Sequence, residues 1–152
     1  MKKNIVILLT LILLSSCSDV FREFQSVTDM KWYKKDAKIF RVNISKEAKY
    51  DFIFAMRYPT GFPYNRIKVK ITRVSENTEA VSKHAEFTVI DENNQYKGEV
   101  SGELWDLEEI FSENELLKPG KYTFKIEHDM NSDPVIAIID IGLIVRKHTS
   151  EK

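Results

Sequence analysis

Apolar and polar residues alternate one by one over much of the chain from Trp32 onward, and this pattern limits the possible folds more than any other feature. Successive side chains of a β-strand point to opposite faces, so alternation predicts strands with one buried face and one face in water. Such strands are typical of antiparallel sheets. Six segments show the pattern: Lys38–Ile44, Asp51–Tyr58, Arg66–Val74, Glu86–Ile90, Tyr122–Ile126 and Ile141–Val145.

Turn-forming residues separate these segments. Pro59–Pro63 lies between the second and third segments, Glu92–Asn94 follows the fourth, and Lys118–Lys121 precedes the fifth. Short alternating strands with turns between them predict an all-β fold, an antiparallel two-sheet β-sandwich that is jelly-roll-like. We expect the sandwich domain over residues 32–148 and a short C-terminal tail over residues 149–152.

One segment, Leu104–Leu117, does not alternate. Its apolar residues recur at helical spacing, at Leu104, Leu107, Ile110 and Phe111. The segment is therefore expected to form either a helix or an irregular loop that carries Trp105.

The chain begins with a short export signal. Lys2 and Lys3 precede an apolar stretch from Ile5 to Leu14, and charged residues follow soon after Cys17. Ten helical residues span roughly 15 Å, about half of a hydrocarbon core, so the stretch is too short to cross a membrane. A charged start, a short apolar run and small residues predict a signal peptide over residues 1–16 that is removed.

The end of this signal is more specific than its middle. Leu14, Ser15, Ser16 and Cys17 resemble a bacterial lipobox, in which a branched apolar residue and two small residues precede a cysteine. The resemblance implies a diacylglyceryl thioether on Cys17, cleavage before it and acylation of the new amino group with a fatty acid such as palmitate. Cys17 is the only cysteine, so a disulfide within the chain is impossible. The other interpretation is an ordinary signal peptide with a chance cysteine.

Lipid attachment predicts where the protein resides. Three acyl chains bury enough CH₂ groups to hold a protein on a bilayer without a membrane-spanning segment. Ser18 does not resemble the aspartate that retains some lipoproteins in the inner membrane, so we expect the outer membrane. Residues 17–31 are expected to form the lipidated cysteine and a tether whose aromatic residues dock onto the domain.

Charge argues against nucleic acid as a partner. The full chain has 23 basic and 23 acidic side chains, and removal of Lys2 and Lys3 leaves 21 against 23. Nucleic-acid binding requires a clustered basic surface, which this balance does not provide. Stability must come from an apolar core, for which 43% hydrophobic and 11% aromatic residues are sufficient.

No catalytic motif is present in the sequence, and neither an enzymatic activity nor a cofactor is predicted. The three histidines lie far apart in the sequence, and no nucleophile elbow or phosphate-binding loop occurs. One weak calcium site is conceivable, because Asp129, Asn131 and Asp133 have the spacing that begins a calcium loop and Asp140 lies at its twelfth position. Pro134 replaces the glycine that such a loop requires, so a hairpin turn is the favoured interpretation.

Several aromatic residues could form a flat surface for a sugar or a partner protein, and Trp32, Tyr64 and Trp105 are the candidates. Aromatic side chains in a sandwich usually lie in its core instead.

A series of motifs in a fixed order resembles the gliding-motility lipoprotein GldH family. After the lipobox, these motifs are Val20–Val27, Trp32 before Lys34 and Asp36, Arg57 before Phe62–Asn65, Gly102–Asp106, Pro119–Ile126 and Ile139–Leu143. The resemblance covers nearly the whole chain. It implies a lipoprotein of the cell envelope without catalytic residues, associated with the machinery that secretes and moves surface adhesins.

Two functions follow as expectations. The first is a lipid-anchored, non-catalytic interaction protein that assembles with envelope proteins of a motility or secretion complex. The alternative is a lipid-anchored carbohydrate-binding β-sandwich module of the envelope, which would use the aromatic residues above.

Overall fold

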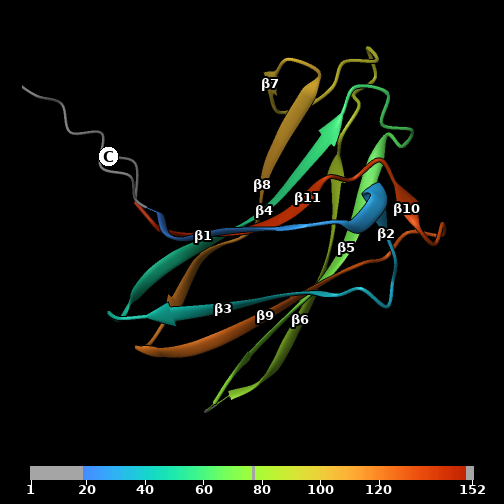
Figure 1. Ribbon diagram of the computed structural model, residues 1–152. Helices are drawn as coiled ribbons and strands as arrows, with labels where there is room; N and C mark the ends of the chain where they lie inside the picture. Colours follow the sequence, from blue (N-terminus) through green and yellow to red (C-terminus); the bar gives the residue numbers. More distant parts are fainter. Residues whose placement is uncertain (1–18, 77, 150–152) are drawn as a thin grey trace, which may run out of the picture.

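The computed structural model describes residues 19–76 and 78–149, which form two antiparallel sheets packed face to face (Figure 1). The first sheet has the strand order β1-β11-β4-β8-β7, and the second has the order β3-β9-β5-β6. A small pair, β2 with β10, lies at one end. The strands are β1 Asp19–Ser26, β2 Lys31–Trp32, β3 Lys38–Ile44, β4 Ala48–Pro59, β5 Arg66–Ser75, β6 Thr78–Thr88, β7 Glu99–Ser101, β8 Leu104–Leu117, β9 Gly120–His128, β10 Val135–Ile136 and β11 Asp140–Lys147, and a 3-10 turn spans Thr28–Met30.

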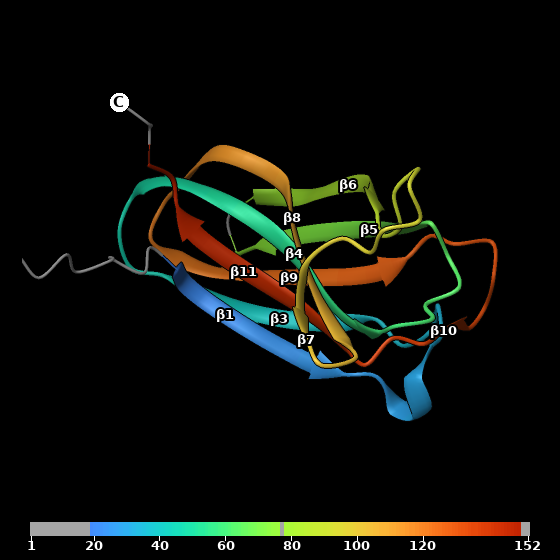
Figure 2. The ribbon, with the colours of Figure 1, turned by 90° about the horizontal axis from the view of Figure 1, so that it is seen from above.

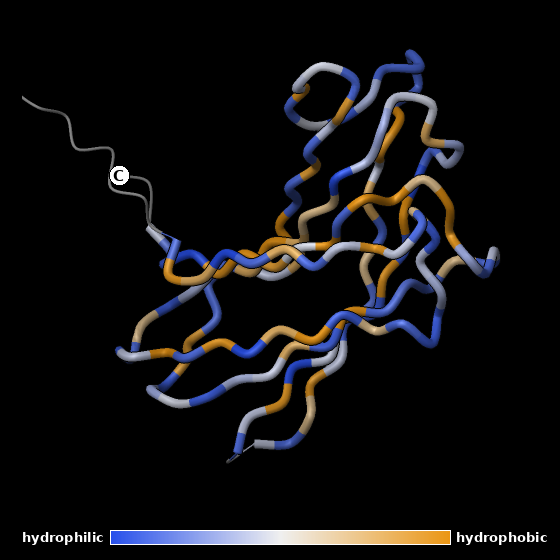
Figure 3. The backbone as a smooth tube through the Cα atoms, in the orientation of Figure 1, coloured by the Kyte–Doolittle hydropathy of each residue, from blue (hydrophilic) through white to orange (hydrophobic). Residues whose placement is uncertain are grey.

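The apolar core lies between the two sheets. Seen from above, the strands of the first sheet lie over those of the second (Figure 2). Polar and apolar residues alternate along the strands as the sequence predicts (Figure 3). On β4 of the first sheet, every second residue from Phe52 to Tyr58 is buried in the core. On β5 of the second sheet, Ile67, Val69 and Ile71 are buried in the same core. The prediction of an antiparallel β-sandwich is confirmed.

The first sheet begins earlier in the chain than the sequence predicts. Asp19–Ser26, expected as part of a tether, is the edge strand β1 and pairs with β11 from Arg146 to Asp140. Phe21 packs against the core, while Phe24 is 38% exposed on the other side of the strand. A bulge between Asp19 and Phe21 disturbs the alternation of this strand, so its apolar residues Val20, Phe21 and Phe24 do not follow a period of two.

The expectation of a helix or loop at Leu104–Leu117 is wrong. This segment is β8, and it pairs with β4 along its whole length. The register shifts opposite Phe52, and Asn114 has a positive φ of 58°. Bulges insert extra residues into a strand, so the apolar positions of β8 no longer follow a period of two.

A cluster of charges joins the two sheets beside the core. Glu115 on β8 accepts hydrogen bonds from Arg73 on β5 at 2.5 Å and from Lys83 on β6 at 2.8 Å, and Ser112 also contacts its carboxylate. Burial alone raises the pKa of Glu115, but the hydrogen bonds from Lys83, Ser112 and Arg73 outweigh it and lower the pKa to about 2. The ionised carboxylate therefore holds the first sheet to the second.

We expect the stability of the protein to fall in acid through this cluster. Because the folded pKa of Glu115 is below its usual 4.5, the stabilisation is complete above pH 4.5 and is lost as the pH falls toward about 2. Glu115→Gln should lower the free energy of unfolding at neutral pH by on the order of 2 kcal/mol. Urea unfolding of the wild type and of Glu115→Gln at neutral and acid pH measures these free energies. An equal loss of stability in acid for the two proteins would contradict the prediction.

Candidate functional site

The outward side of the first sheet carries a charged surface built from all five of its strands. Strand register places Arg22 on β1, Ile144 on β11, Ile53 on β4 and Ile110 on β8 in one row across the sheet. The neighbouring row contains Phe24, Gly142, Ala55 and Glu108. We call this surface the outer face, and its charged residues are Asp19, Arg22, Arg57, Glu99, Asp106, Glu108, Asp140 and Arg146.

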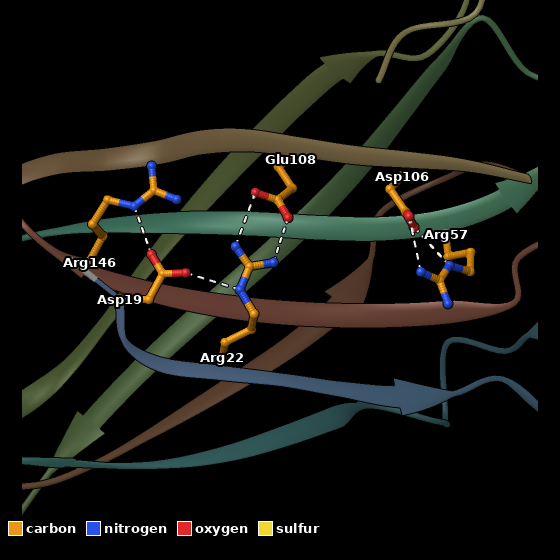
Figure 4. Close-up of polar contacts among 6 residues, drawn as sticks. All are labelled: Asp19, Arg22, Arg57, Asp106, Glu108 and Arg146. Atoms are coloured by element: carbon orange, nitrogen blue, oxygen red, sulfur yellow. Dashed lines mark hydrogen bonds and ion pairs between the residues drawn. The ribbon is translucent and has the colours of Figure 1, made fainter. Parts of the chain in front are cut away.

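Three apolar residues of the outer face are buried although no second layer covers them: Ile53, Ala55 and Ile144 are only 3%, 1% and 0% exposed. Arg22 and Glu108 provide the cover. Their side chains meet at 2.6 Å, although β11 and β4 lie between the strands that carry them (Figure 4). The stem of an arginine can lie on apolar surface while its guanidinium stays in water. The ion pair thus bridges the apolar row.

The close approach of Phe24 to Gly142 completes this arrangement. A Cβ atom at position 142 would lie 2.7 Å from the ring of Phe24 and 3.1 Å from Ala55. Only glycine leaves room there for the ring. Phe24 therefore covers the neighbouring row and helps hold β1 on the sheet.

Asp19 fixes one end of the ion-pair network. It accepts hydrogen bonds from Arg146 at 2.7 Å and from Arg22 at 3.0 Å. Burial raises the pKa of Asp19, but the two arginines outweigh burial and lower the pKa. The hydrogen bond to Glu108 in turn raises the pKa of Arg22. Asp19 and Arg22 are therefore both charged at neutral pH.

A second group lies at the other end of the outer face. Arg57 donates two hydrogen bonds to Asp106, at 2.7 and 3.0 Å, and lies 3.9 Å from Asp140. Beside it is an open hollow of about 410 Å³ lined by Arg22, Gly98, Glu99, Asp106 and Glu108. A Cβ at position 98 would lie 2.3 Å from the carbonyl oxygen of Asp106, so only glycine permits this approach of the chain to β8.

The outer face combines features of protein interfaces. Its charged residues comprise five carboxylates and three arginines, so it is acidic overall. Exposed apolar side chains lie among them, with Phe24 38%, Ile110 51% and nearby Val100 57% exposed. Arginine and aromatic residues are enriched in binding surfaces, where charge complementarity selects the partner. The arrangement suits a basic partner segment.

The calcium candidates take part in other contacts. Asp129 contacts His84 at 3.0 Å, Asp133 accepts a hydrogen bond from the Lys34 amide, and Asp140 accepts one from Ser26. Within residues 19–76 and 78–149, no group of three or more histidine, cysteine, aspartate or glutamate side chains could hold a metal ion, and Asp129, Asn131, Asp133 and Asp140 contribute to none.

The aromatic candidates do not form one surface. Trp32 is fully buried, and its indole nitrogen donates to the Asp36 carbonyl at 2.8 Å, so its assignment to a ligand surface is wrong. Tyr64 and Trp105 are half-buried at the two ends of a row of rings that also contains Phe62, Tyr58 and Tyr96. The indole of Trp105 donates to Thr60 at 3.0 Å. These rings mainly pack the end of the sandwich.

The lipobox residues Leu14, Ser15 and Ser16 and the lipid-attachment residue Cys17 lie outside the described residues. In the described part of the chain, no helix is long and apolar enough to cross a membrane.

His128, at the end of β9, is a buried titratable residue that sequence inspection missed. Its ring packs edge-on against Trp32 at 5.3 Å, and neither ring nitrogen has a hydrogen-bond partner among the described residues. Asp133 lies 3.5 Å from Nε2. Burial lowers the pKa of His128, and this effect outweighs the opposing attraction of Asp133, while Lys34 lowers the pKa further.

We expect mild acid to destabilise the protein through His128. The unfolded histidine has the ordinary pKa of 6.5 and the folded one a lower value, so the unfolded state gains protons first as the pH falls through 6.5. The free energy of unfolding should therefore decrease between about pH 7.5 and about pH 5.5. His128→Leu should reduce this decrease, whereas His84→Leu, at an exposed site, should not. Urea unfolding at the two pH values measures the decrease in the free energy of unfolding. An identical decrease for the wild type and for His128→Leu would refute the prediction.

Sequence inspection also missed the outer face itself. Its members come from strands that lie far apart in the sequence, and three of these strands, β1, β7 and β8, were not predicted. The only available signal was arginine or carboxylate at alternate positions of otherwise apolar strands, as at Arg57 and Arg146.

The fold is a small two-sheet β-sandwich domain whose first sheet carries the charged outer face. A sequence profile of the GldH lipoprotein family matches residues 19–145, and the chain therefore belongs to the GldH lipoprotein family. Membership in a lipoprotein family indicates a membrane-anchored protein of the cell envelope.

Other comparisons add little. A search of curated proteins found no match. Three solved structures are weakly similar. The first is the Eiger TNF from S. frugiperda, with a TM-score of 0.35 and 9% identity over 80% of this chain and 92% of that chain. The second is a family 35 carbohydrate-binding module from Clostridium thermocellum, with a TM-score of 0.35 and 13% identity over 78% of this chain and 97% of that chain. The third is the VP2 subviral particle of infectious bursal disease virus, with a TM-score of 0.34 and 12% identity over 86% of this chain and 34% of that chain.

Proposed function

We propose that this protein is a lipid-anchored, non-catalytic interaction component of a gliding-motility or adhesin-secretion complex, held on the outer membrane through Cys17. Its family membership and the lipobox support the anchor. The observation that carries the interaction role is the outer face, where Arg22 and Glu108 bridge a buried apolar row and leave Phe24 and Ile110 exposed.

The chemistry of the outer face specifies the kind of partner. Glu99, Asp106 and Glu108 surround the hollow beside β7, and Arg22 is the only cationic residue lining it. A lysine or arginine of a partner protein would be attracted there, while its apolar residues would contact Ile110. Because β11 and β4 are paired on both sides and β8 is paired with β4 along its whole length, binding would require little rearrangement.

A charge-reversal variant tests the proposal. Glu99→Arg combined with Ile110→Arg changes two exposed positions of the outer face that take part in no core packing, so the fold should remain intact. Crosslinking in native envelopes followed by mass spectrometry should recover a specific protein partner with the wild type. Recovery with this variant should fall about tenfold or more.

The matched control is Val74→Arg combined with Glu76→Arg, which changes one exposed apolar residue and one exposed carboxylate of the second sheet. It should recover the same partner at the wild-type level. Equal recovery by the two double variants would place the interaction elsewhere, and the absence of any specific partner with the wild type would remove the interaction role.

A further inference from the structure

Covalent geometry places one end of the sandwich next to the lipid, an inference that rests on the proposed anchor at Cys17. The first sheet begins at Asp19, two residues after Cys17. Two residues span at most about 7 Å in any conformation. The domain therefore has almost no tether, and the end at which β1 begins must stay close to the lipid headgroups.

Several turns meet at this end, which we call the anchor end. Because neighbouring strands are antiparallel, β11 ends beside the start of β1, and β4 begins beside the end of β11. Leu116 and Leu117, at the end of β8, pair with Lys49 and Ala48. The anchor end therefore comprises the start of β1, the turns at residues 45–47 and 118–119, and the end of β11, all near the left side of Figure 1.

The anchor end is basic. Its strands and turns carry five exposed lysines and the exposed Glu47 and Glu113, and the β5–β6 turn beside Lys118 and Lys121 adds Glu76. The opposite end has the reverse balance, although Lys31, Lys34, Lys35 and Lys97 are exposed there: residues 89–103 carry four acidic residues, and Asp29, Asp129 and Asp133 are also exposed. Basic residues close to a membrane are attracted to anionic headgroups within a Debye length of roughly 8–10 Å. The lysines are Lys46, Lys49, Lys118, Lys121 and Lys147.

An apolar side chain lies among these lysines. Leu116 is 61% exposed and is the most exposed large apolar residue in the described part of the chain. It sits directly opposite Lys49 on the outward side of the first sheet, and Val20 on β1 is 49% exposed at the same end. Exposed apolar residues flanked by lysines are typical of surfaces that contact the membrane interface.

We propose that the anchor end rests on an anionic phospholipid surface, with its lysines on the headgroups and Leu116 inserted between them. In this orientation β1 leads away from the bilayer, and its eight residues reach roughly 26 Å. The outer face then stands beside the bilayer, with Asp19 and Arg146 nearest to it. The acidic hollow at Glu99 and Asp106 lies at the far end of the sheet, where a partner can reach it. The lipid surface thus fixes the direction in which the outer face is presented.

The test uses the full-length lipidated protein. A cysteine replaces either Leu116 at the anchor end or Asn93 in the opposite loops, and it is the only free thiol because Cys17 carries the lipid. Each variant is labelled with a fluorophore and reconstituted into vesicles of phosphatidylcholine and phosphatidylglycerol that contain brominated lipid. Quenching at position 116 should exceed quenching at position 93 several-fold.

Lysine variants provide the charge control. The combination of Lys46→Glu, Lys49→Glu and Lys118→Glu should reduce quenching at position 116 by at least half. The combination of Lys31→Glu, Lys34→Glu and Lys35→Glu, which changes three exposed lysines at the other end, should leave it unchanged. Equal effects of the two combinations would overturn the proposal.

Vesicle flotation tests the lipid anchor at Cys17 separately from the orientation of the domain. If the protein floats with the vesicles and positions 116 and 93 are quenched equally, the orientation is wrong while the anchor stands. If the wild-type protein does not float, the anchor at Cys17 is wrong, and the orientation that depends on it falls with it.

Discussion

Cys17→Ala should remove the protein almost completely from the membrane fraction of its host, or leave it there only as a precursor with residues 1–16 attached. The thioether requires a thiol, and cleavage at a lipobox requires the modified cysteine. Each buried CH₂ contributes about 0.8 kcal/mol, so losing three acyl chains removes most of the free energy of membrane binding. Membrane fractionation with immunoblotting and precursor size measures the outcome.

Two controls separate anchoring from folding. Ser18→Ala leaves the lipobox unchanged and should fractionate and mature like the wild type. The β-sandwich of Cys17→Ala should unfold at the wild-type urea midpoint, because Cys17 precedes the first strand. A mature-sized Cys17→Ala protein that remained on the membrane would contradict lipid anchoring at this residue.

Trp32→Ala should have the largest effect on stability, lowering the free energy of unfolding by about 3–5 kcal/mol. Trp32 is fully buried between β10 and His128, and its indole donates to the Asp36 carbonyl. Its removal would leave a cavity under the β2–β10 pair and an unpaired carbonyl. Urea unfolding measures the change directly.

Trp105→Ala is the matched control. Trp105 is half-buried and its one side-chain hydrogen bond goes to Thr60, so the loss should be about 1–2 kcal/mol. Similar losses for the two tryptophans would contradict the assignment of Trp32 to the core. A loss of binding without a loss of stability in Trp32→Ala would restore Trp32 as a ligand-contacting residue.

The strands that could be predicted are those in which buried and outward residues alternate without a bulge. Phe40, Val42 and Ile44 on β3, and Phe124 with Ile126 on β9, are buried as the alternation predicts. β1 and β8 were missed because bulges shift their period and because Phe24 and Ile110 place large apolar residues on the outward side. A local pattern cannot show that the strand beside β11 comes from residues next to the lipid.

The candidate site was harder to predict than the fold for a physical reason. Single positions such as Trp32 were chosen for residue type, and aromatic residues serve both cores and binding surfaces. The outer face instead depends on pairs such as Arg22 with Glu108, which are 86 residues apart in the sequence. Only the strand order β1-β11-β4-β8 brings them together.

Intact-mass analysis of the protein purified from its native envelope tests the central claim most directly. The account predicts a chain that starts at Cys17, with a diacylglyceryl group on its sulfur and a fatty acyl group on its amino nitrogen. An unmodified Cys17, or a chain that still contains residues 1–16, would contradict both the anchor and the function proposed for it.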